Sequence, residues 1–207
     1  EEVPTFYSVN CLKAILLAVL FAVAGILFCV LLHKSADLFG KWFPNPYLRV
    51  AVGGIAVILL ALILHTSDYL GLGEAILKDS FVNAQNLERF LLKMIFTCLT
   101  LSSGFKGGEI VPSLFIGATL GSALSSILAL PANLCAGCGM VGVFCAVTNC
   151  PVSSMLIAAE LFGFTGMPYY CVVIAVSYLI SGYKSLYHAQ TIVYSKTENK
   201  YVNRHIE

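Results

Sequence analysis

Apolar residues form long, uninterrupted runs along this chain, and these runs set its predicted elements. Residues 14–32 carry no charge over 19 positions, close to the roughly 20 residues that an α-helix needs to cross the hydrocarbon core of a bilayer. A shorter apolar run, residues 50–64, begins near a pair of glycines. The pattern therefore predicts one full membrane span followed by a shorter apolar helix.

The later apolar runs are short or interrupted by glycine, proline and polar residues. They cover residues 90–101, 110–130, 134–147, 152–164 and 167–181. Unpaired backbone at membrane depth is tolerated only where it is buried in protein or lines a polar cavity, so interrupted segments point to a transport site. We expect an all-α, polytopic membrane protein of about eight or nine helices, several of which do not cross the bilayer.

Composition agrees with a membrane environment and excludes nucleic acid as a partner. The chain is 58% hydrophobic and 11% charged, with a mean hydropathy of +0.87, whereas soluble domains carry about 25% charged residues. Twelve Lys and Arg against eleven Asp and Glu leave a net charge of +1, so nothing favours a polyanion. The lipid bilayer is the expected surrounding, and the cell membrane, crossed several times, the expected location.

Basic residues gather in two segments, which we expect on the cytoplasmic side by the positive-inside rule. The first segment is the loop 33–49, and the second follows Gly182. We interpret residues 1–194 as one transmembrane domain and residues 195–207 as a short cytoplasmic tail, too small to bury a core of its own. Because the first Met is Met94, we expect the chain to be part of a longer protein. The basic residues are Lys34, Lys41, Arg49, Lys184, Lys196, Lys200 and Arg204.

The stretch 102–112, SSGFKGGEIVP, leads a flexible loop into an apolar run. Pro112 suits a first helical turn, so the preceding amides would lie at a helix N-terminus, which carries about half a positive charge and attracts anions. Glycines there let the backbone approach an ion closely. An ordinary turn with Glu109 complementing the helix dipole is the open alternative. The predicted anion-binding residues of this stretch are Gly107, Gly108, Glu109, Ile110 and Val111.

Three motifs in order resemble the chloride channel and antiporter (CLC) family. GGEIVPSLFIGA at residues 107–118 is similar to the family's G-G-x-F-x-P-x-L-x-x-G-A signature. The stretch 139–160 resembles its A-G-M-x-A…A-P-x-x…E pattern, and GYKSLY at residues 182–187 resembles its G-x-x-x-L-Y. Glu109 followed by Ile110 resembles the fluoride/proton antiporter branch, although Val111 stands where that branch would have Thr.

The resemblance implies the second inverted-repeat half of a CLC-type transporter, with broken and re-entrant helices. Tyr187 would donate its hydroxyl to the central anion, and Glu109 would couple proton movement to anion movement. The N-terminal half, which carries the gate in that family, would be a missing partner. The resemblance also implies a homodimer with residues 152–181 at its interface, and chloride or fluoride as the transported ion, with protons as a second transported species.

Two rival functions stay open at this point. Cys135 and Cys138 form a CxxC that could serve a membrane thiol oxidoreductase, and the chain could also be a structural membrane subunit. Tyr187 could belong to an interfacial aromatic belt with Tyr183 and Tyr194. The histidines lack metal-ligand spacing, so we expect no metal site. For a transport protein we also expect no cofactor, no catalytic residue and no enzyme activity. Transport of a small inorganic anion, channel-like or proton-coupled, is the predicted function.

Overall fold

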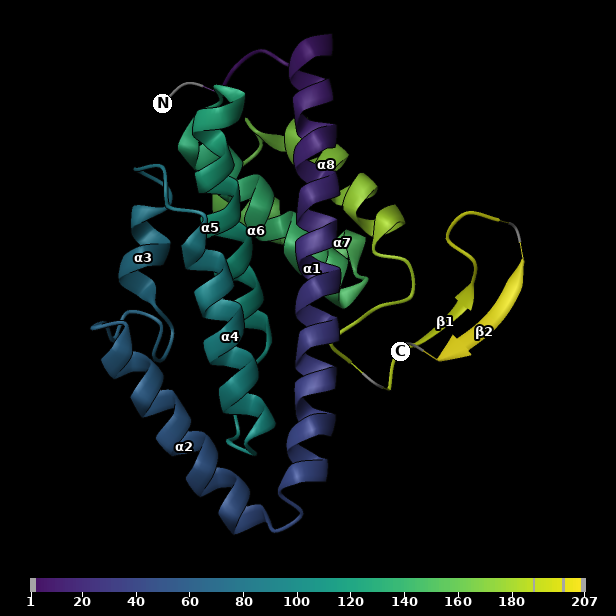
Figure 1. Ribbon diagram of the computed structural model, residues 1–207. Coiled ribbons are helices and arrows are strands. Elements are labelled where there is room, and N and C mark those ends of the chain that lie inside the picture. The colour runs from purple at the N-terminus through teal and green to yellow at the C-terminus, as the bar shows by residue number, and fades with distance from the viewer. Residues whose placement is uncertain (1–2, 188, 199, 206–207) are drawn as a thin grey trace.

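Helices make up most of the computed structural model, which describes residues 3–187, 189–198 and 200–205. The described residues form eight helices and one antiparallel pair of strands (Figure 1). The mostly helical fold predicted from the sequence is confirmed. The helices are α1 (Ser8–Trp42), α2 (Pro46–Ile63), α3 (Glu74–Asp79), α4 (Glu88–Ser102), α5 (Ile110–Leu128), α6 (Ala132–Thr148), α7 (Pro151–Phe162) and α8 (Met167–Ile180), and the strands are β1 (Thr191–Tyr194) and β2 (Tyr201–His205).

The helix α1 runs along nearly the whole height of the molecule (Figure 1). Its 35 residues correspond to about 52 Å at 1.5 Å per residue, well beyond the predicted span 14–32. The helix continues to Trp42 because no proline interrupts it before Pro44, and the position preceding a proline disfavours helix. The next helix starts at once, with Pro46 in its first turn and the Asn45 side chain accepting a 3.0 Å hydrogen bond from the Tyr47 N–H.

The remaining helices have unequal lengths, as the interrupted apolar runs predict. Within the described part of the chain, α1, α2 and α5 are long and apolar enough to cross a membrane. The helices α4, α6, α7 and α8 have 15, 17, 12 and 14 residues, short of the roughly 20 that a perpendicular crossing requires. The fold therefore combines one long helix with several shortened ones.

The closest helix packing in the molecule joins α5 to α6. A Cβ atom on Gly117 would lie 2.2 Å from the carbonyl oxygen of Gly139, and one on Gly121 would lie 2.0 Å from the carbonyl oxygen of Cys135. Any side chain at these positions would overlap backbone, so the small-residue spacing lets the two helices touch. This contact is the most extensive between any two helices described, and it fixes the direction of α5.

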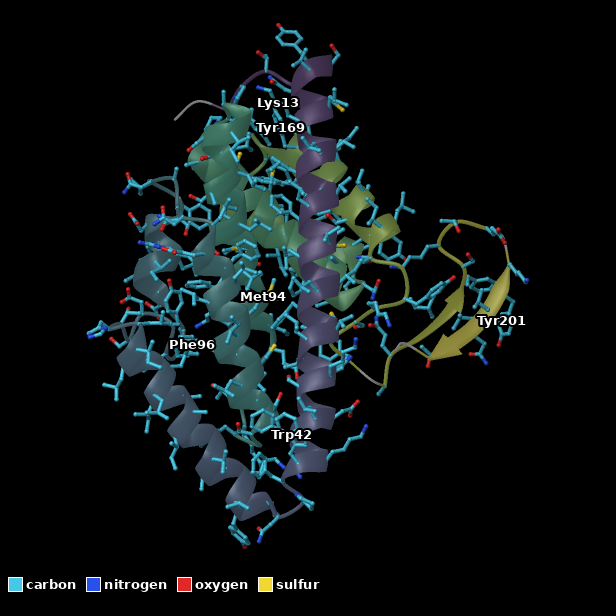
Figure 2. The ribbon with its side chains drawn as sticks, in the orientation of Figure 1. Lys13, Trp42, Met94, Phe96, Tyr169 and Tyr201 are labelled. Atoms are coloured by element: carbon cyan, nitrogen blue, oxygen red, sulfur yellow. The ribbon has the colours of Figure 1, made fainter. Side chains whose placement is uncertain are left out.

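The helix α4 packs on both of its sides. Met94 is fully buried in the main core together with residues of α1, whereas Phe96 belongs to a second cluster with Tyr69 and residues of α2. Figure 2 shows these two labelled side chains on opposite sides of α4. In contrast to α4, α2 buries only Gly53 and leaves most of its apolar surface exposed.

A small β-hairpin, which the sequence analysis did not anticipate, stands apart from the helices (Figure 1). Thr191 pairs with His205 and Tyr194 with Tyr201, with an irregular register between Ile192 and Tyr194. The predicted boundary between residues 194 and 195 falls at the end of β1, so half of the hairpin lies in the predicted tail. The division into a transmembrane domain and a short tail stays a prediction.

Candidate functional site

The glycine-rich loop between α4 and α5 ends in the first turn of α5. Gly104 has a φ of +94°, a conformation that L-residues with side chains avoid. The helix begins at Ile110 with Pro112 in its first turn, as predicted. The Ser113 N–H donates to the carbonyl of Glu109 at 3.2 Å. The N–H groups before Ser113 have no acceptor inside the helix, so they are directed out of its N-terminal end, here called the α5 mouth (residues 107–111).

Open space lies beside the backbone at the α5 mouth. A Cβ atom on Gly108 would meet nothing within 4 Å, whereas one on Gly107 would come within 3.0 Å of a methyl group of Leu101. Both glycines are exposed. An ion could therefore approach the backbone at Gly108 without displacing any described atom.

Tyr187 follows α8 in a segment without regular structure that is fastened to the end of α6. The Leu186 N–H donates to the carbonyl of Val147 at 2.9 Å, and the Ser185 hydroxyl donates to the same oxygen at 3.0 Å. The Tyr187 N–H in turn donates to the Ser185 hydroxyl oxygen at 3.2 Å. The backbone of Tyr187 is therefore held by α6 and not by the helix that precedes it.

Tyr187 lies within electrostatic range of Glu109 at the α5 mouth. Burial raises the pKa of the Tyr187 hydroxyl, and the Glu109 carboxylate raises it further, which requires the two side chains to lie within electrostatic range. His33 of α1 hydrogen-bonds to the carbonyl of Leu186 at 3.5 Å, so α1 borders the same region. With its pKa raised, Tyr187 keeps its hydroxyl proton and remains a hydrogen-bond donor. Two residues of the predicted site, Glu109 and Tyr187, thus lie within electrostatic range although they are 78 positions apart in the sequence.

A cavity of about 560 Å³ opens beside the α5 mouth. Gly107, Gly108 and Val111 line it together with residues of α2, of α4 and of the loop 69–72. Ile110 and Val111 leave more than a third of their surface exposed. The α5 mouth therefore lines a largely apolar cavity.

Lys93 on α4 is a residue of this cavity that the sequence analysis missed. Its side chain is 2% exposed, and its ammonium donates to the carbonyls of Tyr69 at 3.1 Å and Gly71 at 2.7 Å. It also lies 5.0 Å from the centroid of the Phe115 ring. The sequence pattern that could have revealed Lys93 is that it is the single charged residue inside the apolar run 90–101. Lys93 ties the loop 69–72 to α4 and closes one end of the cavity.

The cysteine pair of the rival interpretation lies inside the main core. Cys135 and Cys138 are 0% and 1% exposed and belong to the hydrophobic cluster that includes residues of α1 and α8. A thiol that exchanges with a partner must be reachable, and these are not. Within the described ranges, no group of three or more His, Cys, Asp or Glu side chains could hold a metal ion.

Comparison with known proteins identifies the family. A profile of the family described as "Voltage gated chloride channel" matches residues 2–182. The chain belongs to this family. A chloride/fluoride channel protein of Pseudomonas syringae pv. tomato is 38% identical over 184 residues, which are 86% of this chain and 41% of that protein. The putative ion-transport protein YfeO of Escherichia fergusonii is 29% identical over 142 residues, covering 66% of this chain and 34% of that protein.

A solved structure also matches the fold. The crystal structure of a CLC-type fluoride/proton antiporter superposes with a TM-score of 0.85 at 33% identity, covering 90% of this chain and 48% of that one. The chain is thus a membrane protein of the voltage-gated chloride channel family, and it spans less than half of the length of these relatives. The matched range includes the α5 mouth and ends before Tyr187, whose assignment therefore depends on its position in the structure.

Proposed function

We propose that the intact protein moves a small inorganic anion, chloride or fluoride, across the cell membrane, and that the α5 mouth and Tyr187 bind the ion. Gly107, Gly108, Glu109, Ile110 and Val111 supply the backbone of the mouth, and Tyr187 supplies a hydroxyl. The supporting relatives include a chloride/fluoride channel protein and a fluoride/proton antiporter.

The observation that carries this proposal is a helix N-terminus with open space beside its backbone and a tyrosine within electrostatic range. First-turn amides at a helix N-terminus favour negative charge, and the backbone at Gly108 faces open space. Tyr187 lies within electrostatic range of Glu109, the N-cap residue of that helix. Amide and hydroxyl donors stabilise an anion without a fixed cation, so the ion is held weakly enough to leave again.

Glu109 has a second role in the proposal, which is to couple proton movement to anion movement. Glu109 occupies the N-cap position of the helix that would bind the anion, and an ionised carboxylate and an anion repel each other at close range. The neutral acid can instead donate a hydrogen bond. Anion binding would therefore favour the protonated acid, and anion release would favour the ionised one.

The rival functions are less well supported by the same residues. A thiol oxidoreductase would need access to Cys135 and Cys138, which are buried in the main core. A purely structural subunit would not need an exposed glycine pair at a helix N-terminus. Transport without enzymatic chemistry accounts for these features, and it requires no metal or organic cofactor.

The proposal extends to assembly. A homodimer would cover the apolar surface of α7 and of the connection that follows it, where Val152, Leu156 and Phe164 are each more than 60% exposed. Exposed apolar patches of this kind mark contacts with protein or lipid. The chain that completes the ion pathway would cover α2 and the open flank of the α5 mouth.

The proposed function is tested by Gly108→Val in the intact protein, reconstituted into liposomes and assayed with a fluoride or chloride electrode. A valine would fill the space in which the ion approaches the backbone, so we expect flux to fall by about tenfold or more, the change that ~1.4 kcal/mol of lost binding produces. Gly40→Val is the matched control, because a Cβ there also meets nothing within 4 Å but lies near the end of α1. Equal flux in the two variants would remove the α5 mouth from the mechanism.

A further inference from the structure

Lys196, in the loop of the β-hairpin, makes hydrogen bonds to residues of the helices. The ammonium of Lys196 donates to the side-chain oxygen of Asn149, to the carbonyl of Tyr178 at 2.8 Å and to the hydroxyl of Ser181 at 3.0 Å. It also lies 4.1 Å from the centroid of the Tyr178 ring. An ammonium has three N–H donors, and all three find an acceptor here.

These acceptors belong to the C-terminal ends of two helices. Asn149 is the C-cap of α6, with a φ of 57°, while Tyr178 and Ser181 lie in the last turn and at the C-cap of α8. Helix C-termini carry a partial negative charge that favours a cation. Lys196 therefore bridges two helix ends that attract it, and it fastens the hairpin to both.

The Asn149 side chain connects this bridge to the segment that carries Tyr187. Its oxygen accepts from Lys196 and from Ser181 (3.3 Å), while its amide nitrogen donates to the carbonyl of Lys184 at 2.8 Å. An amide side chain has one accepting end and one donating end. With its oxygen held by the ammonium, the nitrogen must face Lys184, three residues before Tyr187.

We propose that Lys196 is a positioning residue for Tyr187. Lys196 orients the Asn149 amide, and this amide in turn anchors the segment 184–187 that carries Tyr187. The inference depends on the proposed role of Tyr187 as an anion ligand. Residues on either side of Tyr187 strengthen the connection, since Gln190 donates to the carbonyl of Thr148 at 3.1 Å and accepts from Ser185 at 2.8 Å. The tail thus sets anion affinity without touching the ion.

A double-mutant cycle tests this inference by calorimetric titration of fluoride or chloride into the intact protein. Lys196→Met removes the three hydrogen bonds and retains an apolar stem of similar length. We expect it to weaken anion affinity by about two- to tenfold, on the scale of one lost hydrogen bond. In a Tyr187→Phe background the same change should weaken affinity by less than about twofold. Lys200→Met is the matched control, because Lys200 is exposed on the same hairpin, and it should leave affinity unchanged.

Asn149→Asp separates positioning from simple stability. An aspartate keeps the acceptor for Lys196 and tolerates the left-handed backbone, but it has no amide to donate to Lys184. We expect anion affinity to fall as in Lys196→Met while the thermal unfolding midpoint stays at or above that of the parent. Parental affinity in both Lys196→Met and Asn149→Asp would overturn the inference.

The cycle also separates the inference from the proposed function. If Tyr187→Phe weakens binding and Lys196→Met does not, the positioning role is wrong while the anion site stands. If Lys196→Met weakens binding equally with and without the Tyr187 hydroxyl, Lys196 acts by another route and the inference fails. If Tyr187→Phe leaves affinity unchanged, Tyr187 is not a ligand, and both the inference and this part of the proposed function fall.

Discussion

Glu109 is the residue at which the chemistry of the α5 mouth is decided. It occupies the N-cap position of α5, and its charge acts on Tyr187. An acidic residue beside a helix N-terminus is ordinarily stabilising, which on its own would explain the residue. In an anion site, however, the same carboxylate competes with the ion for the amides, so its protonation state becomes part of the binding equilibrium.

We predict that Glu109→Gln slows or uncouples proton movement more than it weakens anion binding. Glutamine keeps the shape of the neutral acid and a donor group but cannot release a proton. Paired fluoride and pH electrodes on proteoliposomes of the intact protein measure both fluxes at once. A proton-to-anion ratio equal to that of the parent would leave Glu109 as a capping residue only.

At the scale of elements, the geometry of the site depends on how closely α5 approaches α6. The glycines at positions 117 and 121 permit contact between the backbones, and the same α6 holds the Tyr187 segment through Val147. A change in the spacing of these two helices would therefore move the amide donors relative to the hydroxyl donor.

We predict that Gly117→Ala lowers the thermal unfolding midpoint of the intact protein in detergent and that Gly40→Ala does not. A methyl group at position 117 would lie 2.2 Å from a carbonyl oxygen, and such overpacking costs about 1–3 kcal/mol. At position 40 the methyl group meets nothing within 4 Å, so alanine's higher helix propensity would add up to about 1 kcal/mol. Similar midpoints for the two variants would show that α5 and α6 can separate without cost.

Local patterns predicted the elements that depend on local chemistry. Pro112 marked the first turn of α5, which begins at Ile110. The extension of α1 to Trp42 could have been inferred from the lack of proline before Pro44, but the apolar run alone suggested a shorter span.

Contacts between distant residues could not be predicted in the same way. The Tyr187 segment is fixed by a carbonyl of Val147, 39 and 38 positions from its donors Leu186 and Ser185, and no local pattern encodes that pairing. The strands of the hairpin have only four and five residues, TIVY and YVNRH, and the second is largely polar, so the pair gave too short a pattern to predict a hairpin. Lys196 gave no signal beyond its charge, because its acceptors come from two other helices.

At the scale of the whole molecule, the length of α1 and the position of the tail bear on which parts of the chain lie outside the bilayer. The helix α1 is about 52 Å long, whereas the hydrocarbon core of a bilayer is about 30 Å thick. One end of α1 must therefore extend well into water or the headgroup region, and Lys41 lies in its last turn. Figure 1 shows the hairpin at about the mid-height of α1, to the side of the helices.

We predict that Lys41 and the hairpin share the cytoplasmic side, as their basic neighbours favour. Lys41→Cys and Lys200→Cys, each made in a background without the partly exposed Cys11, Cys150 and Cys171, should react with a membrane-impermeant maleimide in inverted vesicles and not in intact cells. The background without either new cysteine is the control for residual labelling. Because Lys196 fastens the hairpin to the ends of α6 and α8, the tail cannot cross the bilayer without breaking that bridge. Labelling of the two positions from opposite sides would therefore contradict both the charge-based topology and the attachment of the hairpin.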